Sequence, residues 1–130
     1  MSHKPETVFI TSVHKYVKCY HMKNNNLYNS GIPDCWYSGP IRDAWIEYKF
    51  VVLPKRGATI IKPELSPIQF NWLTDRFKEG RNVFVLIGSK LGGVWLHRDD
   101  WEIGMTKLEY NACLQTRPQI AAYIDRMCGC

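Results

Sequence analysis

The sequence has no long hydrophobic run. Its longest apolar stretch, residues 44–53, contains Glu47 and Lys49 and is too short to cross a bilayer, which takes about 20 residues. The first residues, MSHKPETVFITSV, include no sustained apolar core, and the last residues form no prenylation box, so neither a secretory signal nor a lipid anchor is predicted. We therefore expect a protein that works in the cytoplasm.

The sequence has few cysteines, and their number is odd. There are five, and a chain of 130 residues can build a core without disulfides. The closing Cys128-Gly129-Cys130 lacks the second pair of ligands that a zinc site requires. We therefore expect reduced thiols and no disulfide framework.

Internal repeats, low-complexity tracts and linkers are also absent. The length of 130 residues fits one domain, residues 1–130, because two domains would leave neither half enough core. What the chain does have is a modest positive charge, with 17 Lys and Arg against 12 Asp and Glu, a net +5. This excess favours a polyanionic partner, although ordinary solubility would account for it as well.

The order of local patterns predicts an α/β (mixed α+β) fold, with a central mixed sheet flanked by helices. The clearest helix begins after Ser66, a good N-cap that Gln69 completes as a capping box, and it ends before Gly80. Its buried stripe is predicted to be Phe70, Leu73 and Phe77. The other predicted helices are residues 5–18, 107–115 and 118–127, and the predicted strands are residues 27–28, 35–37, 44–52, 82–88 and 93–97.

Two short motifs lie on either side of a predicted hairpin: Gly-Ile-Pro-Asp at residues 31–34 and Ile-Glu-Tyr-Lys at residues 46–49. Side chains alternate across a strand, so Glu47 and Lys49 point to the same face. A hairpin of this length places Asp34 beside them, and Gly31 lets the backbone bend tightly next to the acid. An isolated Glu-x-Lys is more often a solvated pair on an outer strand, but the apolar residues on both sides of this one favour a central strand.

Two carboxylates and an ammonium group at one point suit metal-dependent phosphodiester cleavage. Mg²⁺ prefers oxygen ligands, which Asp34, Glu47 and the backbone carbonyl of Tyr48 would supply. Lys49 would orient or deprotonate the attacking water and offset negative charge in the transition state. A different hairpin register would bring Asp43 rather than Asp34 to the metal, and on the sequence alone both registers remain open.

These motifs, in this order, resemble the PD-(D/E)XK nuclease superfamily, and in particular its virus-type replication-repair nuclease (VRR-NUC) branch. The matching frame is Gly-x-Pro-Asp at residues 31–34, aliphatic-Glu-x-Lys at 46–49, Ser-Pro-x-Gln-x-x-Trp at 66–72, and Gly80 before the apolar strand 83–87. The resemblance covers residues 6–90, and the segment after Gly92 departs from the frame.

The resemblance implies a restriction-endonuclease-like fold that cuts DNA with Mg²⁺ or Mn²⁺. It implies that Asp34 and Glu47 are metal ligands, Lys49 is the catalytic lysine and Gln69 is an auxiliary group near the site. The first-helix acid of the family falls on Glu6, which would be a further ligand. Other roles fit two of these residues: Gln69 is also the capping-box glutamine, and Glu6 is also a negative charge favoured at a helix N-terminus.

Stand-alone members of this branch are similar to phage junction-resolving enzymes, which implies a homodimer that cuts branched DNA such as Holliday junctions. For a phage-encoded protein the compartment would be the cytoplasm of the bacterial host. Because one site cuts one strand, a symmetric paired cut needs two subunits. Basic residues would bind the DNA phosphates, or are solvated surface charges: Lys55, Arg56 and Lys62 in the loop of residues 54–63, and Arg76, Lys78 and Arg81 beyond it.

Two other functions remain open. A restriction-like or mobile-element endonuclease would share the site but would need sequence readout, and no recognition helix is visible. A non-catalytic nucleic-acid-binding module would not need the complete acid–acid–lysine set. The aromatic residues Trp36, Tyr37 and Trp45 are expected mainly in the core, and would otherwise stack on unpaired bases.

Overall fold

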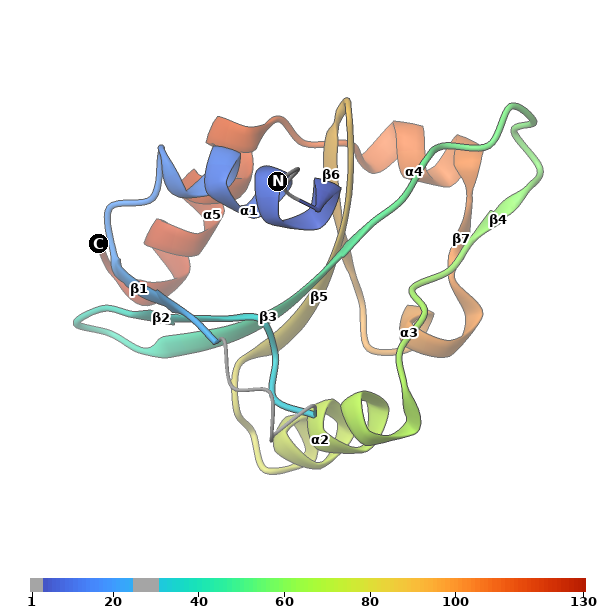
Figure 1. The fold of residues 1–130 in the computed structure, drawn as a ribbon. Helices are drawn as coiled ribbons and strands as arrows, with labels where there is room; N and C mark the ends of the chain where they lie inside the picture. The colour runs from blue at the N-terminus through green and yellow to red at the C-terminus, as the bar shows by residue number, and fades with distance from the viewer. Residues whose placement is uncertain (1–3, 25–30) are drawn as a thin grey trace.

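The computed structural model describes residues 4–24 and 31–130 and confirms the predicted class, a mixed sheet flanked by helices (Figure 1). The helices are α1 Pro5–His14, α2 Pro67–Lys78, α3 Asp100–Ile103, α4 Lys107–Cys113 and α5 Arg117–Cys128. The strands are β1 Tyr20–Lys23, β2 Cys35–Ser38, β3 Asp43–Phe50, β4 Ile60–Ile61, β5 Val83–Ser89, β6 Gly92–Leu96 and β7 Met105–Thr106.

Five strands form the main sheet in the order β1-β2-β3-β5-β6. The β3–β5 pair is parallel and the other pairs are antiparallel. Parallel neighbours cannot be joined by a tight hairpin, and the crossover between β3 and β5 carries α2. The remaining strands, β4 and β7, form a separate two-stranded sheet. The predicted hairpin β2–β3 is therefore central, with β1 on one side of it and β5 on the other.

The sheet is covered on both faces, and α1 and α5 lie on the opposite side from α2 (Figure 1). We call these sides the α1/α5 face and the α2 face. Ile46 and Tyr48 of β3 are buried in the core cluster that contains residues of α1 and α5. Trp45 of β3 packs instead on the cluster that contains Leu73 of α2. Alternation along β3 thus sends Glu47 to the α2 face, as the sequence predicts.

The first helix ends at His14, so the prediction that it continues to residue 18 is wrong. After His14 the chain tightens, and the N–H groups of Tyr16 and Val17 bond to carbonyls three residues back. The N–H groups of Lys18 and Cys19 are then taken by the carboxylate of Asp125 on α5, at 3.0 Å each. This long-range cap turns the chain into β1, a strand that sequence reasoning missed. The strand predicted at residues 27–28 lies outside the described residues.

Helix α2 has the predicted capping box, in which Ser66 accepts from the Gln69 N–H and Gln69 accepts from the Ser66 N–H. Its predicted buried stripe is only partly right. Leu73 is 1% exposed, but Phe77 is 46% exposed. The ring of Phe77 packs edge-on against Trp101 of α3 at the end of the helix, so one side of the ring is covered and the other is not.

Cys19 and Cys130 form a disulfide across 111 residues, with their Cα atoms 5.5 Å apart. The expectation of reduced thiols is therefore wrong for this pair, although Cys35, Cys113 and Cys128 are free. The number of cysteines could not predict that the C-terminus lies beside Cys19 in the fold. Gly129 adopts a left-handed conformation at the end of α5, with φ +87°, which reverses the chain and brings Cys130 to the start of β1.

No helix within residues 4–24 and 31–130 is long and apolar enough to cross a membrane.

Candidate active site

The register of the hairpin brings Asp34 to the middle of β3. Cys35 pairs with Ile46, so the residue before Cys35 lies level with Glu47 and Tyr48. The N–H of Tyr48 donates a hydrogen bond of 2.9 Å to Oδ2 of Asp34. Asp43 pairs with Ser38 at the opposite end of the hairpin, which excludes the alternative register.

The turn that carries Asp34 packs tightly on the start of α2. A Cβ added to Gly31 would lie 2.6 Å from the side chain of Ile68 and 3.2 Å from its carbonyl oxygen. Any larger residue would require the Ile68 side chain, and to a smaller extent its carbonyl, to move. Gly31 thus fixes the distance between the Asp34 turn and the helix that carries Gln69.

Glu47 lies at the centre of the site and is 2% exposed. Its Oε2 is 3.4 Å from Nζ of Lys49 and accepts a 3.1 Å hydrogen bond from Nε2 of Gln69. Lys49 also donates to Oε1 of Gln69, at 3.3 Å. Asp34, Glu47, Lys49 and Gln69 therefore converge from three elements: the turn before β2, strand β3 and helix α2.

Gln69 has contacts that match both predicted positions, in the helix cap and beside Glu47. Its Oε1 accepts from the N–H of Ser66, which caps the helix, while its Nε2 donates to Glu47. The cap locks the rotamer of the glutamine and so aims its amide nitrogen at the carboxylate. The two roles are thus geometrically coupled, because the bond to Ser66 leaves the amide N–H₂ free to point toward β3.

Burial and mutual repulsion alter the acidity of the carboxyl groups. Burial, with the nearby Asp34 as the second cause, raises the pKa of Glu47 to about 8, and Lys49 opposes this. Burial likewise raises the pKa of Asp34, while the hydrogen bond from the Tyr48 N–H and the charge of Lys49 lower it. Two partly dehydrated carboxyl groups close together cannot both ionise freely. At neutral pH the pair holds less negative charge than its composition implies, unless a cation compensates.

Glu6 and Lys23 lie near these acids. Burial raises the pKa of Glu6, and the next largest cause is the charge of Asp34. Lys23 on β1 lowers the pKa of both Asp34 and Glu6, and it donates to Thr7 of α1 at 3.2 Å. Sequence reasoning missed Lys23 because it missed β1; the Tyr-His-Met-Lys run just before the asparagines was the available signal.

Glu6 does not form a compact ligand set with the other acids. In the described part of the chain, the group of three His, Cys, Asp or Glu donors that lie within 4.8 Å of one another is Cys19, Asp125 and Cys130. The two sulfurs of that group are joined in the disulfide and its carboxylate caps backbone N–H groups. That group is therefore a structural tie between the chain end and β1.

The residues at the site suit a hard divalent cation. Asp34 and Glu47 offer carboxylate oxygens. The N–H and C=O of one strand residue point to the same side, so the Tyr48 carbonyl faces Asp34 as its N–H does. Oxygen donors of this kind are the ones that Mg²⁺ and Mn²⁺ prefer. A cation would also remove the repulsion that raises the pKa of Glu47.

The basic residues predicted to contact DNA lie apart from the acids. Lys55 and Arg56 are exposed in the loop between β3 and β4, which Figure 1 shows beside α4, and Lys62 is exposed directly after β4. The loop is held there by backbone hydrogen bonds, from Lys107 to Thr59 and from Leu108 to Gly57. Among the described residues, none of the three basic side chains forms a hydrogen bond or an ion pair with Asp34 or Glu47.

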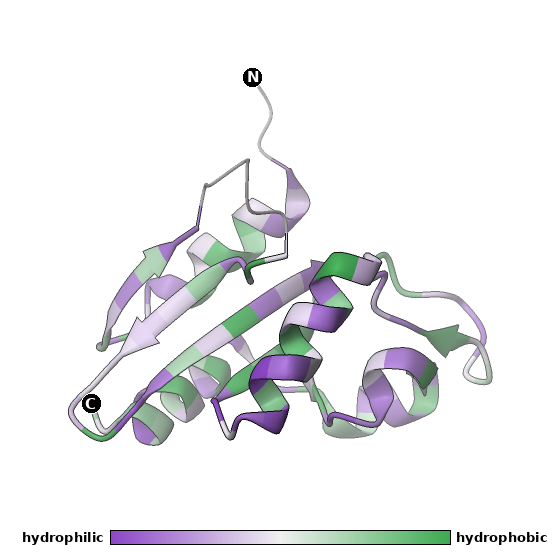
Figure 2. Ribbon diagram, turned by 90° about the horizontal axis from the view of Figure 1, so that it is seen from below, coloured by the Kyte–Doolittle hydropathy of each residue, from purple (hydrophilic) through white to green (hydrophobic). Residues whose placement is uncertain are grey.

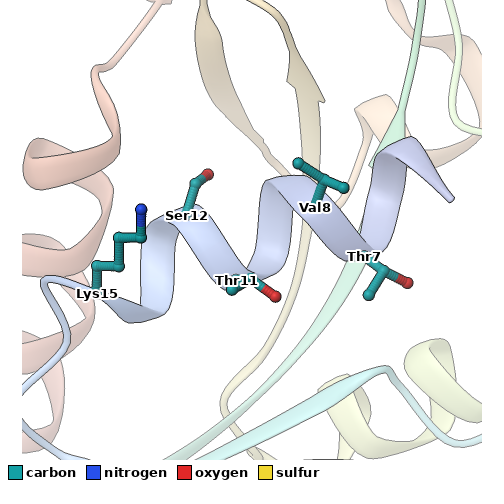
Figure 3. A pocket seen from close by; sticks show the side chains of 5 residues that line it. All are labelled: Thr7, Val8, Thr11, Ser12 and Lys15. Atoms are coloured by element: carbon teal, nitrogen blue, oxygen red, sulfur yellow. The ribbon is translucent and has the colours of Figure 1, made fainter. Parts of the chain in front are cut away.

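A hollow of about 270 Å³ lies along α1 and is not part of this site (Figure 3). It is lined by Thr7, Val8, Thr11, Ser12 and Lys15. Thr7 accepts from Lys23, and Ser12 accepts from Arg117 and donates to Phe9, so its polar groups are largely used in the fold.

Comparison of the chain with protein-family models, with curated proteins and with solved structures found no match.

Proposed function

We propose that the protein is an endodeoxyribonuclease that hydrolyses DNA phosphodiester bonds with Mg²⁺ or Mn²⁺. The observation that carries the proposal is the burial of Glu47 against Asp34, Lys49 and Gln69. Burying one acid beside another destabilises the fold, so a purely structural role does not explain the pair. The same arrangement is useful for binding a cation next to a phosphate.

Asp34, Glu47 and the Tyr48 carbonyl would hold the cation, and Gln69 would keep the Glu47 carboxylate in place. A divalent cation, when bound, acidifies a water molecule and neutralises charge on the phosphate oxygens. Lys49 is 21% exposed at its side chain, so its ammonium group can reach a phosphate from beside Glu47. There it would orient the attacking water, or accept a proton from it, and offset charge in the transition state.

The proposed substrate is branched DNA, such as a Holliday junction, and the proposed assembly is a homodimer. The net charge of +5 supports a polyanionic partner. The proposed compartment is the cytoplasm, that of the bacterial host for a phage protein. Disulfides are uncommon there, so the Cys19–Cys130 bond is the feature of the fold that weighs against this location.

The test is cleavage of four labelled substrates by purified protein with Mg²⁺ or Mn²⁺: linear duplex, single strand, flap and four-way junction. We expect the junction and flap to be cut. Glu47→Ala and Lys49→Ala should each abolish cutting, whereas Glu64→Ala, at an exposed acid of the loop after β4, should not.

The other outcomes distinguish the alternatives. Cutting of one duplex sequence alone would support a restriction-like or mobile-element enzyme. Binding of DNA without cutting by any metal would support a non-catalytic module and overturn the proposal. Cutting that survives both Glu47→Ala and Lys49→Ala would place the activity elsewhere or in a contaminant.

A further inference from the structure

A row of aromatic side chains crosses the α2 face from β1 to α2. It consists of Tyr20 on β1, Trp36 on β2, Trp45 on β3 and Trp72 on α2. Successive ring centroids are 6.1, 6.0 and 5.7 Å apart. We call these four residues the aromatic row. The first two strand members face the same way as Trp45 because Trp36 pairs directly with Trp45, and Tyr20 pairs with Ser38, two residues along β2.

The row is open to solvent along much of its length. Tyr20 is 64% exposed, and its neighbour Met22 is 46% exposed. Trp36, Trp45 and Trp72 are half-buried, so each keeps part of its ring at the surface. Figure 2, which views the molecule from below, shows β2 and the first half of β3 with no described helix in front of them. By contrast, Tyr37 and Tyr48 on the other face are 0% exposed.

The row leads directly into the candidate active site. Trp45 is two residues before Glu47 on the same face of β3, and Trp72 is three residues after Gln69, about one turn along α2. Trp45 and Trp72 are therefore close in the chain to Glu47 and Gln69, and a ligand that covers these two rings would lie beside the site. Continuity with the site is what separates this aromatic surface from an ordinary exposed patch.

Positive charge accompanies the row where it meets α2. A hollow of about 170 Å³ is lined by Asp43, Trp45, Trp72, Arg76 and Arg81. The guanidinium of Arg76 lies over the Trp72 ring at 5.5 Å. Glu79 pairs with Arg76, and the Trp36 indole N–H donates to Asp43. Arg81 is exposed and forms no ion pair among the described residues, so its guanidinium is free to donate to a phosphate.

We propose that the aromatic row binds the unpaired bases of a DNA strand, with Arg76 and Arg81 on its phosphates, and guides that strand to the acids. Aromatic rings give sequence-tolerant stacking because every base has a π-face, and arginines follow the backbone. Paired bases in a duplex are already stacked and cannot use the row. The inference rests on the proposed nuclease function, and it narrows the proposed branched substrate to one with a single-stranded segment, such as a flap, rather than a fully paired junction.

The test is binding without cleavage, measured by fluorescence anisotropy with labelled dT15 and a blunt 15-base-pair duplex in EDTA. Tyr20→Ala, Trp36→Ala and Trp72→Ala should each weaken dT15 binding by about 5-fold to 100-fold. Duplex binding should change by less than about 2-fold, because it uses charge rather than stacking. The quenching of tryptophan fluorescence by dT15 should fall in Trp36→Ala.

Matched controls lie off the row. Tyr16→Ala removes a tyrosine that is 51% exposed, and Trp95→Phe alters a half-buried tryptophan that packs against Phe84 and Tyr123. Neither should alter dT15 binding. If Trp36→Ala fails to fold, Tyr20→Ala still tests the row, since Tyr20 is its most exposed member. Trp36→Phe keeps a smaller ring at the same position and should weaken dT15 binding less than Tyr20→Ala.

Three results would overturn the inference: equal losses on dT15 and duplex, equal losses in the controls, or changed self-association with unchanged dT15 binding. The last would identify the row as an interface between copies of the chain. Failure of the proposed function is a separate result. If wild-type protein binds dT15 through the row but cuts no DNA, the binding surface is supported and the nuclease function is overturned. If it cuts DNA but binds dT15 independently of the row, the nuclease function is supported and this inference is overturned.

Discussion

Tyr48 and Glu47 are adjacent in β3, yet they enter very different surroundings. On the α1/α5 face, the Tyr48 hydroxyl bonds to Tyr37 at 2.5 Å, and Tyr37 bonds to Nε2 of His14 at 2.7 Å. Burial lowers the pKa of His14 to about 4 and raises the pKa of Cys35 to about 12. Burial also raises the pKa of both tyrosines. Near pH 7 all of these groups are therefore neutral.

On the α2 face, burial raises the pKa of both acids, Glu47 and Asp34. Glu47 has one lysine and one amide as partners, with a second acid nearby. Its pKa of about 8 lies close to neutral pH, so small changes in the surroundings alter its charge. One face of the sheet thus places its buried polar groups far from titration, which favours stability. The other places an acid near titration, which favours chemistry.

The largest effect should come from Glu47→Gln, which keeps the shape of the side chain and removes its charge. We expect DNA cleavage to fall by about 10³-fold or more, because the proposed metal ligand is lost. Kinetics at saturating Mn²⁺ measure this. Lys107→Gln, a half-buried lysine near the loop after β3, is a control that should keep cleavage.

The same variant tests the surroundings of Glu47 through stability. The folded pKa of about 8 is above the ordinary value of 4.5, so the folded state holds the proton more tightly than the unfolded state. This contribution to stability is complete below pH 4.5 and is lost as pH rises through 8. In EDTA, the melting temperature of wild type relative to Glu47→Gln should therefore fall as pH rises from about 4.5 to about 8, and change little above that. A constant difference would show that the pKa of Glu47 is not raised in the folded protein.

The disulfide on the α1/α5 side should give the next largest effect. Cys130→Ser should lower the free energy of unfolding by about 2–4 kcal/mol, because the bond closes a loop of 111 residues in the unfolded chain. Urea denaturation under oxidising conditions measures it. Cys113→Ser, at an exposed free cysteine, should have no effect. Equal midpoints for Cys130→Ser and wild type would mean that the thiols are reduced, as expected for a cytoplasmic protein.

Tyr48→Phe should separate the two faces. Removing the hydroxyl leaves the buried Tyr37 with one partner fewer, and we expect a loss of about 1–3 kcal/mol in the free energy of unfolding. Cleavage should be unchanged, because the ring of Tyr48 points away from the acids while its backbone serves the site. Loss of cleavage in a well-folded variant would show that the two faces are coupled. Tyr16→Phe is the exposed control.

Local signals were sufficient to predict the strands and helix that build the site. The capping box at Ser66 depends on residues three apart. The alternation that directs Glu47 and Lys49 to one face is a property of β3 alone. The hairpin β2–β3 is also local, so an acid beside Glu47 was predictable, but the register that selects Asp34 rather than Asp43 was fixed only by the structure. The fold class was predictable for the same reason, since it needs only the order of the elements.

Contacts between distant parts of the chain were not predictable. The end of α1 depends on Asp125, which lies 107 residues from Lys18, and β1 exists where this cap turns the chain. The disulfide has the same origin. Lys23 reaches the acids only because β1 pairs with β2. The exposed edge of the aromatic row depends on which part of the sheet α2 covers, and no periodicity in the sequence specifies that.

The smallest expected effect concerns Gln69, which joins the helix cap to the site. Ser66→Ala removes the hydroxyl that accepts from the Gln69 N–H but keeps the bond from Nε2 of Gln69 to Glu47, so it should cost about 1 kcal/mol of stability and leave cleavage nearly intact. Gln69→Ala should cost a similar amount of stability and reduce cleavage by a further 10-fold to 100-fold, as losses of groups that orient a metal ligand do. Thermal unfolding and cleavage rates of both variants decide this. Equal cleavage by the two variants would leave Gln69 as a cap alone, and the α2 face would then hold its catalytic acid with Lys49 as the remaining partner.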